Sequence, residues 1–319
     1  MGCTNSPEIN QNETYNKCYT SIRNLSNEVI RIFPIKENEI IVATILNFKI
    51  LDLSEQKEIL TCKFDEEIYS VSFLPSPNRL FLGTCSGALI IENLFEKTTL
   101  KLNAHLTTIT FLYFLENGNL LSCDGNGVIF IWDLEEQISI FNLSLPESKP
   151  IWCVCELKNN NKIILLSGNN KAYVLNLQLK SKDKISSVFN AIDSKFVIQL
   201  YDERIIFNSG NNLICYEECK IPSIHEDFKE LRNKGLNDPD FLVENAHNSI
   251  ITYILQLKSG ELLTGAANGS LHIWRIEKKK LLFIINLEGH HDNINFCIEL
   301  PNGKLATGGD DKMIKLWTL

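Results

Sequence analysis

Three segments of the chain align with one another without gaps, and this internal repetition constrains the fold more than any other feature. They are LLSCDGNGVIFIW (120–132), LLTGAANGSLHIW (262–274) and LATGGDDKMIKLW (305–317). A His lies 27 residues before the final Trp of each segment, at His105, His247 and His290. Self-similarity of this kind indicates an architecture in which small units bury their apolar faces against their neighbours.

Each unit reads as a group of antiparallel strands. Within a segment, two short runs of β-branched and aromatic residues flank Gly, Asn and Asp, which accept the φ > 0 geometry of a narrow hairpin. A further apolar run precedes each segment, such as TTITFLYF (107–114), and another follows, such as KKLLFIINL (279–287). We therefore predict four antiparallel strands for one repeat.

Weaker copies of the same template cover most of the chain. The position held by Trp in the clear copies falls at about Leu51, Glu92, Trp132, Asn176, Tyr216, Trp274 and Trp317. Seven copies account for residues 17–319, and the interval from Tyr216 to Trp274 is the longest. The sequence thus predicts a single all-β domain of seven repeats over 17–319, preceded by a tail over 1–16.

This pattern resembles the WD-repeat β-propeller family, whose blades run about 40–45 residues with an upstream His and a Trp-Asp ending. The resemblance implies a seven-bladed propeller in which some blades carry a hydrogen-bonded tetrad. The tetrad positions are His290, Thr307, Asp311 and Trp317 in the last blade, His105, Ser122, Asn126 and Trp132 in the third, and His247, Thr264, Asn268 and Trp274 in the sixth. Asn in place of Asp predicts weaker networks in the third and sixth blades.

The resemblance also implies how the ring closes. The sequence given stops directly after the third strand of the last blade, whereas KCYTSIRNL (17–25) precedes the first blade without a partner of its own. We expect this N-terminal strand to complete the last blade, because an unpaired strand edge invites aggregation.

One blade contains an insert at about 218–239. Ile224, Phe228 and Leu231 recur at helical spacing, and Gly235 would end such a helix. The insert is expected between the third and fourth strands of the fifth blade. Either it packs on its own blade, or it presents Phe228, Lys229 and Arg232 to a partner, since long loops on rigid scaffolds often bind. Further candidate partner-binding residues lie in loops near the repeated His positions: Thr107, Asn248, His291, Asp292 and Lys312.

The N-terminal MGCTNS fits the pattern for N-myristoylation of Gly2, with Cys3 beside it as a candidate for palmitoylation. One myristoyl chain gives only reversible membrane binding, and residues 1–16 lack the Lys and Arg that could provide an electrostatic second signal. Stable anchoring would therefore require both Gly2 and Cys3. Pro7 lies where myristoylated proteins disfavour proline, so an unmodified terminus is the alternative.

Composition and motifs restrict the function further. A net charge of −8 argues against nucleic-acid binding, which needs clustered cations. The ten Cys are irregularly spaced and fit neither a zinc nor a disulfide framework, which is typical of reduced cytosolic thiols. We expect no bound metal, because the repeat explains His290 in the His290-His291-Asp292 sequence. No phosphate loop, dinucleotide fingerprint or nucleophile elbow occurs, so no cofactor, small-molecule substrate or enzymatic activity is expected.

The sequence therefore predicts a non-catalytic scaffold for protein or peptide partners, located in the cytoplasm, with acyl chains as a means of attachment to the cytosolic face of a membrane. The alternative is a soluble structural subunit of a large cytoskeletal, ciliary, ubiquitin-ligase or trafficking assembly. An enzyme using the centre of the propeller is a third, less favoured class.

Overall fold

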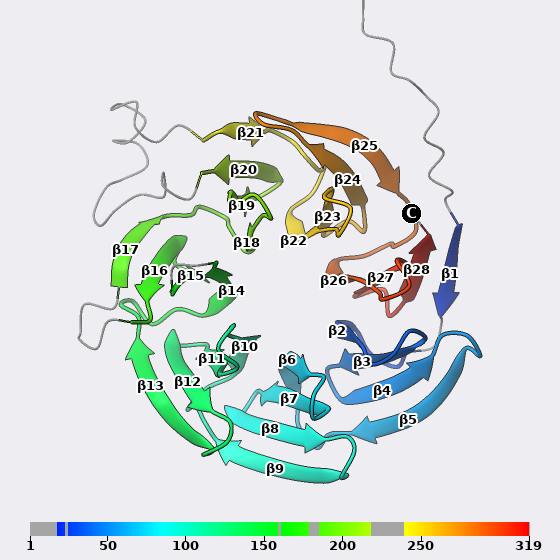
Figure 1. The fold of residues 1–319 in the computed structure, drawn as a ribbon, viewed down its shortest axis with the longest axis vertical. Helices are drawn as coiled ribbons and strands as arrows, with labels where there is room; N and C mark the ends of the chain where they lie inside the picture. Colours follow the sequence, from blue (N-terminus) through cyan, green and yellow to red (C-terminus); the bar gives the residue numbers. More distant parts are fainter. Residues whose placement is uncertain (1–17, 23–24, 159–160, 179–184, 218–238, 319) are drawn as a thin grey trace, which may run out of the picture.

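The structure, a computed structural model, describes residues 18–22, 25–158, 161–178, 185–217 and 239–318. These residues form strands and turns, without a helix among them. The strands make seven four-stranded antiparallel sheets arranged in a ring (Figure 1). The predicted all-β, seven-bladed propeller is confirmed.

Each blade is numbered by its place along the chain. The first blade is formed by β2 (Val29–Pro34), β3 (Glu39–Thr44), β4 (Asn47–Asp52) and β5 (Lys57–Lys63). The second is formed by β6 (Ile68–Leu74), β7 (Arg79–Thr84), β8 (Ala88–Asn93) and β9 (Thr98–Asn103). The third is formed by β10 (Ile109–Phe114), β11 (Leu120–Asp124), β12 (Val128–Asp133) and β13 (Ile138–Ser144). The fourth is formed by β14 (Ile151–Leu157), β15 (Lys162–Ser167), β16 (Lys171–Asn176) and β17 (Ile185–Asn190).

The remaining blades follow the same plan. The fifth is formed by β18 (Val197–Gln199), β19 (Ile205–Ser209), β20 (Asn212–Tyr216) and β21 (Phe241–Val243). The sixth is formed by β22 (Ile251–Gln256), β23 (Leu262–Ala266), β24 (Leu271–Ile276) and β25 (Leu281–Leu287). The seventh is formed by β26 (Ile294–Glu299), β27 (Leu305–Gly309), β28 (Ile314–Thr318) and β1 (Cys18–Ile22).

Burial changes from strand to strand across a blade, and the sequence follows it. The second strands, such as β11 and β27, are buried at every position, because neighbouring blades cover both of their faces. Their sequences are accordingly short apolar runs. The fourth strands lie at the rim, where β5 and β13 are mostly exposed and carry alternating polar residues. The ring is therefore held together by blade-to-blade packing of its inner strands.

The seventh blade joins the two ends of the described chain. β1 pairs with β28 in antiparallel register from Cys18–Thr318 to Ile22–Ile314, as the sequence led us to expect (Figure 1). The contact of this blade with the first is close. A Cβ on Gly308 would lie 2.5 Å from Cγ1 of Val29, so only Gly allows the first strand of the first blade to approach.

The strand register corrects one repeat position. The third and fourth strands shift register immediately before Leu51, Trp132 and Trp274, and in the fourth blade the same shift lies between Val174 and Leu175. The buried Leu175, rather than Asn176, therefore occupies the Trp position of the fourth blade.

The antiparallel order gives the ring two distinct faces. One face, here called the His-loop face, carries the connections from the fourth strand of a blade to the first of the next, and those between second and third strands. The opposite face, here called the turn face, carries the connections between first and second and between third and fourth strands. The predicted insert falls in the sequence between β20 and β21, whose facing ends lie on the turn face, and residues 218–238 themselves lie outside the described part.

Candidate interaction surfaces and the central cavity

The tetrad of the seventh blade has the geometry that the repeat implies. The Trp317 indole donates to Thr307 Oγ1 over 2.9 Å, and Thr307 Oγ1 lies 2.7 Å from His290 Nε2. His290 Nδ1 lies 2.8 Å from Asp311 Oδ2. This chain of contacts runs from the third strand to the loop before the first strand, so it fixes that loop against its own blade.

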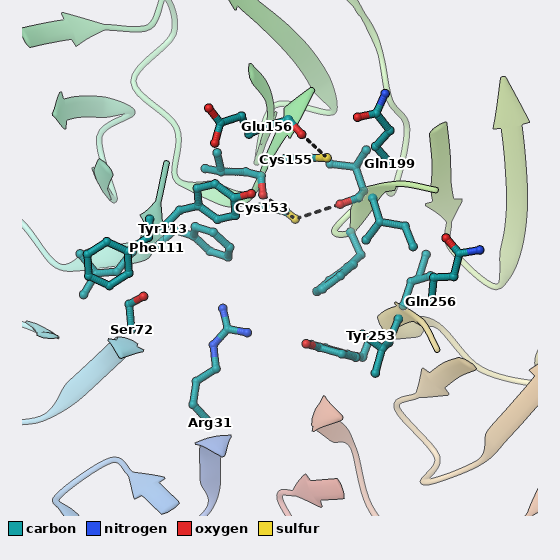
Figure 2. Close-up of a pocket in the computed structure, with 18 of the residues that line it drawn as sticks. Arg31, Ser72, Phe111, Tyr113, Cys153, Cys155, Glu156, Gln199, Tyr253 and Gln256 are labelled. Atoms are coloured by element: carbon teal, nitrogen blue, oxygen red, sulfur yellow. Dashed lines mark hydrogen bonds between the residues drawn. The ribbon is translucent and has the colours of Figure 1, made fainter. Parts of the chain in front are cut away.

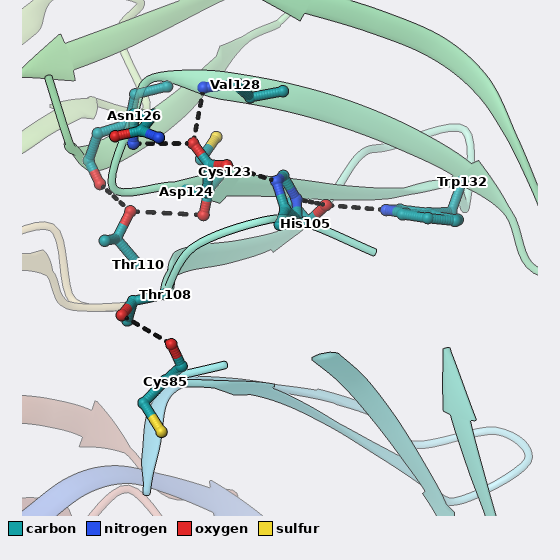
Figure 3. A network of polar contacts seen from close by, with 11 residues as sticks. Cys85, His105, Thr108, Thr110, Cys123, Asp124, Asn126, Val128 and Trp132 are labelled. Atoms are coloured by element: carbon teal, nitrogen blue, oxygen red, sulfur yellow. Dashed lines mark hydrogen bonds and ion pairs between the residues drawn. The ribbon is translucent and has the colours of Figure 1, made fainter. Parts of the chain in front are cut away.

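In the third blade the expected acceptor is wrong. His105 Nε2 and the Trp132 indole both contact Ser122 Oγ, at 2.7 and 2.8 Å, but His105 Nδ1 lies 3.1 Å from Asp124 Oδ2 (Figure 3). The exposed Asn126 contributes only its backbone N–H, which donates to Asp124 Oδ1. Asp124 is the last residue of β11, which brings its carboxylate level with the His. The third blade thus has a full carboxylate network.

The sixth blade differs from prediction in another way. His247 Nε2 and the Trp274 indole contact Thr264 Oγ1 at 2.7 and 2.9 Å, whereas His247 Nδ1 contacts Ser270 Oγ at 2.7 Å. Ser270 in turn donates to Asn268 Oδ1 over 2.8 Å. The amide of Asn268 therefore reaches the His only through a hydroxyl.

These different partners give the three imidazoles different electrostatics. Burial alone would raise the pKa of Asp124 and of Asp311, but hydrogen bonds from His105 and His290 and from backbone N–H groups outweigh it and lower both. His247 has no carboxylate partner, and burial followed by the neighbouring His272 lowers its pKa to about 3. The His of the sixth blade is therefore neutral at physiological pH.

The structure places four of the predicted partner-binding residues at the surface of one face. Asn248, His291, Asp292 and Lys312 are exposed in loops of the His-loop face. Thr107 lies in the same set of loops but is half-buried, with its hydroxyl buried and without a partner among the described residues. Phe228, Lys229 and Arg232 belong to the insert, outside the described residues.

Sequence reasoning missed a group of exposed apolar side chains on the His-loop face. They are Leu106 (97% exposed), Ile192 (61%), Tyr69 (51%), Ile250 (47%), Trp152 (44%) and Leu46 (41%). Each lies in a loop of this face or at the bulge that opens a first strand. The bulge after Ile68 and that after Ile151 turn Tyr69 and Trp152 outward, a register effect that no local pattern announces.

The same face is rich in carboxylates. Its described loops carry Glu28, Asp65, Glu66, Glu67, Glu147, Asp193, Glu244, Glu288, Asp292, Asp310 and Asp311, against Lys149, Lys195 and Lys312. Some are neutralised locally, as Glu66 is by Lys101 at 2.6 Å. The face therefore combines apolar anchors with a surplus of negative charge.

A cavity of about 530 Å³ occupies the centre of the ring (Figure 2). Its walls are inward-facing residues of first strands, among them Phe111, Tyr113, Cys153 and Tyr253. Glu116, Lys158 and Tyr201, from turns between first and second strands, also line it. The cavity thus reaches the turn face.

Arg31 supplies the positive charge deep in this cavity. Its guanidinium lies 4.8 Å from the ring centroid of Phe296 and 5.8 Å from that of Phe111, and it points into the central space (Figure 2). Among the ion pairs of the described residues, none involves Arg31. Cys153 and Cys155 are protonated at neutral pH, because burial raises the pKa of their thiols to about 11 and about 12.

No group of three or more His, Cys, Asp or Glu in the described ranges is placed to hold a metal ion. The described residues also contain no helix long and apolar enough to cross a bilayer.

Comparison with known proteins agrees with this architecture. The WD40 family model, "WD domain, G-beta repeat", matches residues 96–133 and 281–318, which include the third strands of the third and seventh blades. A chain in "Crystal Structure of Mitotic Checkpoint Complex" aligns with a TM-score of 0.75 and 14% identity, covering 100% of this chain and 96% of that chain. The WD40 beta propeller domain of Doa1 aligns with a TM-score of 0.72 and 15% identity, covering 94% of this chain and 95% of that chain. Two segments of the chain therefore match the WD40 repeat, and the chain as a whole has a seven-bladed propeller fold.

Proposed function

We propose that this WD40-repeat propeller is a non-catalytic protein-interaction scaffold that docks a basic segment of a partner on its His-loop face. The exposed apolar side chains of that face carry the proposal, because Trp and Tyr are the residues that most often dominate binding energy at interfaces. The surplus of carboxylates on the same loops favours Lys and Arg in the partner through charge complementarity.

The tetrads support this role by holding the loops in place. His105, His247 and His290 lie in, or next to, the loops that carry Leu106, Ile250 and Asp292, and each is bonded to a hydroxyl of a second strand. Loops fixed in this way lose little conformational entropy when they bind, which improves affinity for a given contact area.

The test uses a library of random twelve-residue peptides displayed on phage and selected on the immobilised full chain. Selected peptides should be enriched in Lys and Arg beside apolar residues, and synthetic versions should bind at least about tenfold more weakly to Leu106→Asp or Trp152→Ala. Phe95→Asp is the matched control, because Phe95 is 84% exposed on the turn face. Peptides that ignore the first two changes, or that respond equally to Phe95→Asp, would exclude this surface.

The proposal includes attachment to a membrane through acyl groups on Gly2 and Cys3. Residues 1–17 lie outside the described part, but β1 begins at Cys18 beside the end of β28, which is on the turn face. An anchor ahead of Cys18 would therefore join the propeller on the face opposite the proposed docking surface. This arrangement supports a tethered scaffold.

Intact-mass analysis of the native protein, with membrane fractionation beside Gly2→Ala and Cys3→Ser, tests the anchor. Masses raised by one myristoyl and one palmitoyl group, with membrane partitioning lost in both variants, are expected. An unmodified and soluble wild type would instead favour the alternative, a subunit of a large cytosolic or cytoskeletal assembly. That result would leave the docking face to be judged by its own test.

A further inference from the structure

We infer that the central cavity is a binding site for a small carboxylate with an apolar body, entered from the turn face. This site is independent of the proposed docking surface, which lies on the opposite face. The volume of about 530 Å³ lies within the range of small-molecule pockets and can hold a single aromatic or branched aliphatic acid.

The residues at each end of the cavity indicate from which face a ligand would enter it. Glu116, Lys158 and Tyr201 lie in turns of the turn face, whereas the described loops of the His-loop face contribute only Phe196, the residue directly before β18. Toward the His-loop face, large rings on the first strands, or directly before β18 in the case of Phe196, pack on one another: Phe196 and Tyr253 at 4.7 Å, and Tyr253 and Phe296 at 5.1 Å. A ligand therefore enters past the turns and meets a floor of aromatic rings.

Arg31 selects an anion at that floor. Equivalent register positions in the other blades hold Ser70, Phe111, Cys153, Phe196, Tyr253 and Phe296, so a single first strand contributes a charge to this ring. The guanidinium lies against the rings of Phe111 and Phe296, and its hydrogen-bonding edge, which donates to the Tyr253 hydroxyl, has no ion-pair partner among the described residues. A planar carboxylate matches such an edge with two hydrogen bonds.

The groups around Arg31 remain neutral and so do not compete with a ligand. Burial raises the pKa of Tyr253, against the opposing effect of Arg31, and its hydroxyl therefore stays protonated and able to donate to an anion. Burial likewise raises the pKa values of Cys153 and Cys155. Phe111, Phe196 and Tyr113 provide apolar walls for the body of the ligand.

The first test is calorimetric titration of the full chain with 3-phenylpropionate and with its uncharged amide. The acid should bind, and the amide should bind at least about tenfold more weakly, because a hydrogen bond to a charged group contributes more than about 1.5 kcal/mol. Arg31→Met, which retains the length and the apolar contacts, should reduce the affinity for the acid to that of the amide. Tyr253→Phe should cause a smaller loss and retains the ring packing if Arg31→Met disturbs the fold.

Lys158→Met is the matched control, because it removes a cation from the exposed rim of the same cavity. Its effect should be small, since exposed charges are screened. A second pair of probes, N-acetyl-Gly-Phe and its C-terminal amide, separates the sources of the carboxylate. Binding of the free acid alone identifies a small molecule, whereas binding of the acetylated dipeptide acid as well places a chain terminus in the cavity.

The inference is overturned by any of three results. These are no heat of binding when the wild type is titrated with millimolar 3-phenylpropionate, equal binding of the acid and the amide, and a loss of affinity in Lys158→Met as large as that in Arg31→Met. The last result would show that the affinity comes from the electrostatic field of charges at the mouth of the cavity rather than from Arg31.

Discussion

His247 and His272 lie face to face in the sixth blade, with ring centroids 3.9 Å apart and an angle of 9° between the ring planes. Burial lowers both pKa values, that of His247 to about 3 with a further contribution from the neighbouring His272, whereas the hydrogen bond to Ala246 partly opposes the lowering of the pKa of His272. His272 Nδ1 is held 2.9 Å from the carbonyl oxygen of Ala246, and His247 Nδ1 by Ser270.

The His pair predicts a loss of stability in mild acid. In the unfolded chain His247 titrates near 6.5, whereas the folded chain resists protonation until about pH 3. The unfolded state therefore binds more protons between these values, and the free energy of unfolding should fall as pH falls through this window. At pH 5 the expected loss from His247 is about 2 kcal/mol relative to pH 7, since one pKa unit corresponds to about 1.4 kcal/mol.

Denaturant unfolding of wild type and His247→Gln across pH 4–8 measures this effect. The variant should be less stable at pH 7 but should show a flatter dependence on pH. His291→Gln is the control, because His291 is exposed, and its profile should match that of the wild type. Equal slopes in all three proteins would contradict the assignment.

The third blade predicts a sharp difference between two nearby residues. Asp124→Asn should cost about 1–3 kcal/mol, because it removes the charge-assisted bond to the buried His105. Asn126→Ala should change stability by less than about 0.5 kcal/mol, since the backbone N–H of residue 126 remains available to Asp124. Chemical denaturation of the two variants decides between them, and a larger loss for Asn126→Ala would refute the network.

Closure of the ring by β1 predicts the effect of truncation. Removing residues 1–22 should lower the melting temperature and cause self-association, because β28 would become an exposed edge strand. Removing residues 1–15 leaves β1 intact and should preserve both properties. Thermal unfolding and size-exclusion chromatography provide the measurements, and identical behaviour of the two truncations would show that β1 is dispensable.

The cysteines predict a selective labelling pattern. Cys85 is exposed, whereas Cys123, Cys153, Cys155, Cys215 and Cys297 are buried with raised pKa values. Because the thiolate is the nucleophile, iodoacetamide at pH 7.5 should modify Cys85 well before these buried residues. Peptide mass mapping over time tests the order, and rapid labelling of Cys153 would indicate that the central cavity opens widely.

The His, hydroxyl and Trp residues of the third, sixth and seventh blades could be predicted because their spacing repeats along the chain. The acceptors on His Nδ1 could not, since Asp124 lies two residues before the motif position and Ser270 two residues after it. The acidic residue in the DGNG turn was the available signal for Asp124, but Asp-Gly also reads as an ordinary turn. Local spacing does not say which side chain of a tight turn faces the imidazole.

Contacts between blades could not be predicted from the sequence for a similar reason. Near the turn face, Glu156, Gln199, Gln256 and Glu299 each accept a hydrogen bond from a backbone N–H of the preceding blade, at 2.7 or 2.8 Å. The equivalent positions of the first three blades hold Pro34, Phe73 and Phe114. These partners meet only after the ring has formed, as do those that surround Arg31, so no window of a single blade contains them.

The pairing of β1 with β28 gives the propeller a mechanical polarity. If the N-terminus is anchored while a partner holds the His-loop face, tension enters at Cys18 and runs along β1. The ladder from Cys18–Thr318 to Ile22–Ile314 would then be sheared, with all its pairs strained together instead of being peeled apart in turn. Resistance to such a force is governed by the unfolding rate rather than by equilibrium stability. β1, which completes the ring, would then also be the strand that bears the applied force.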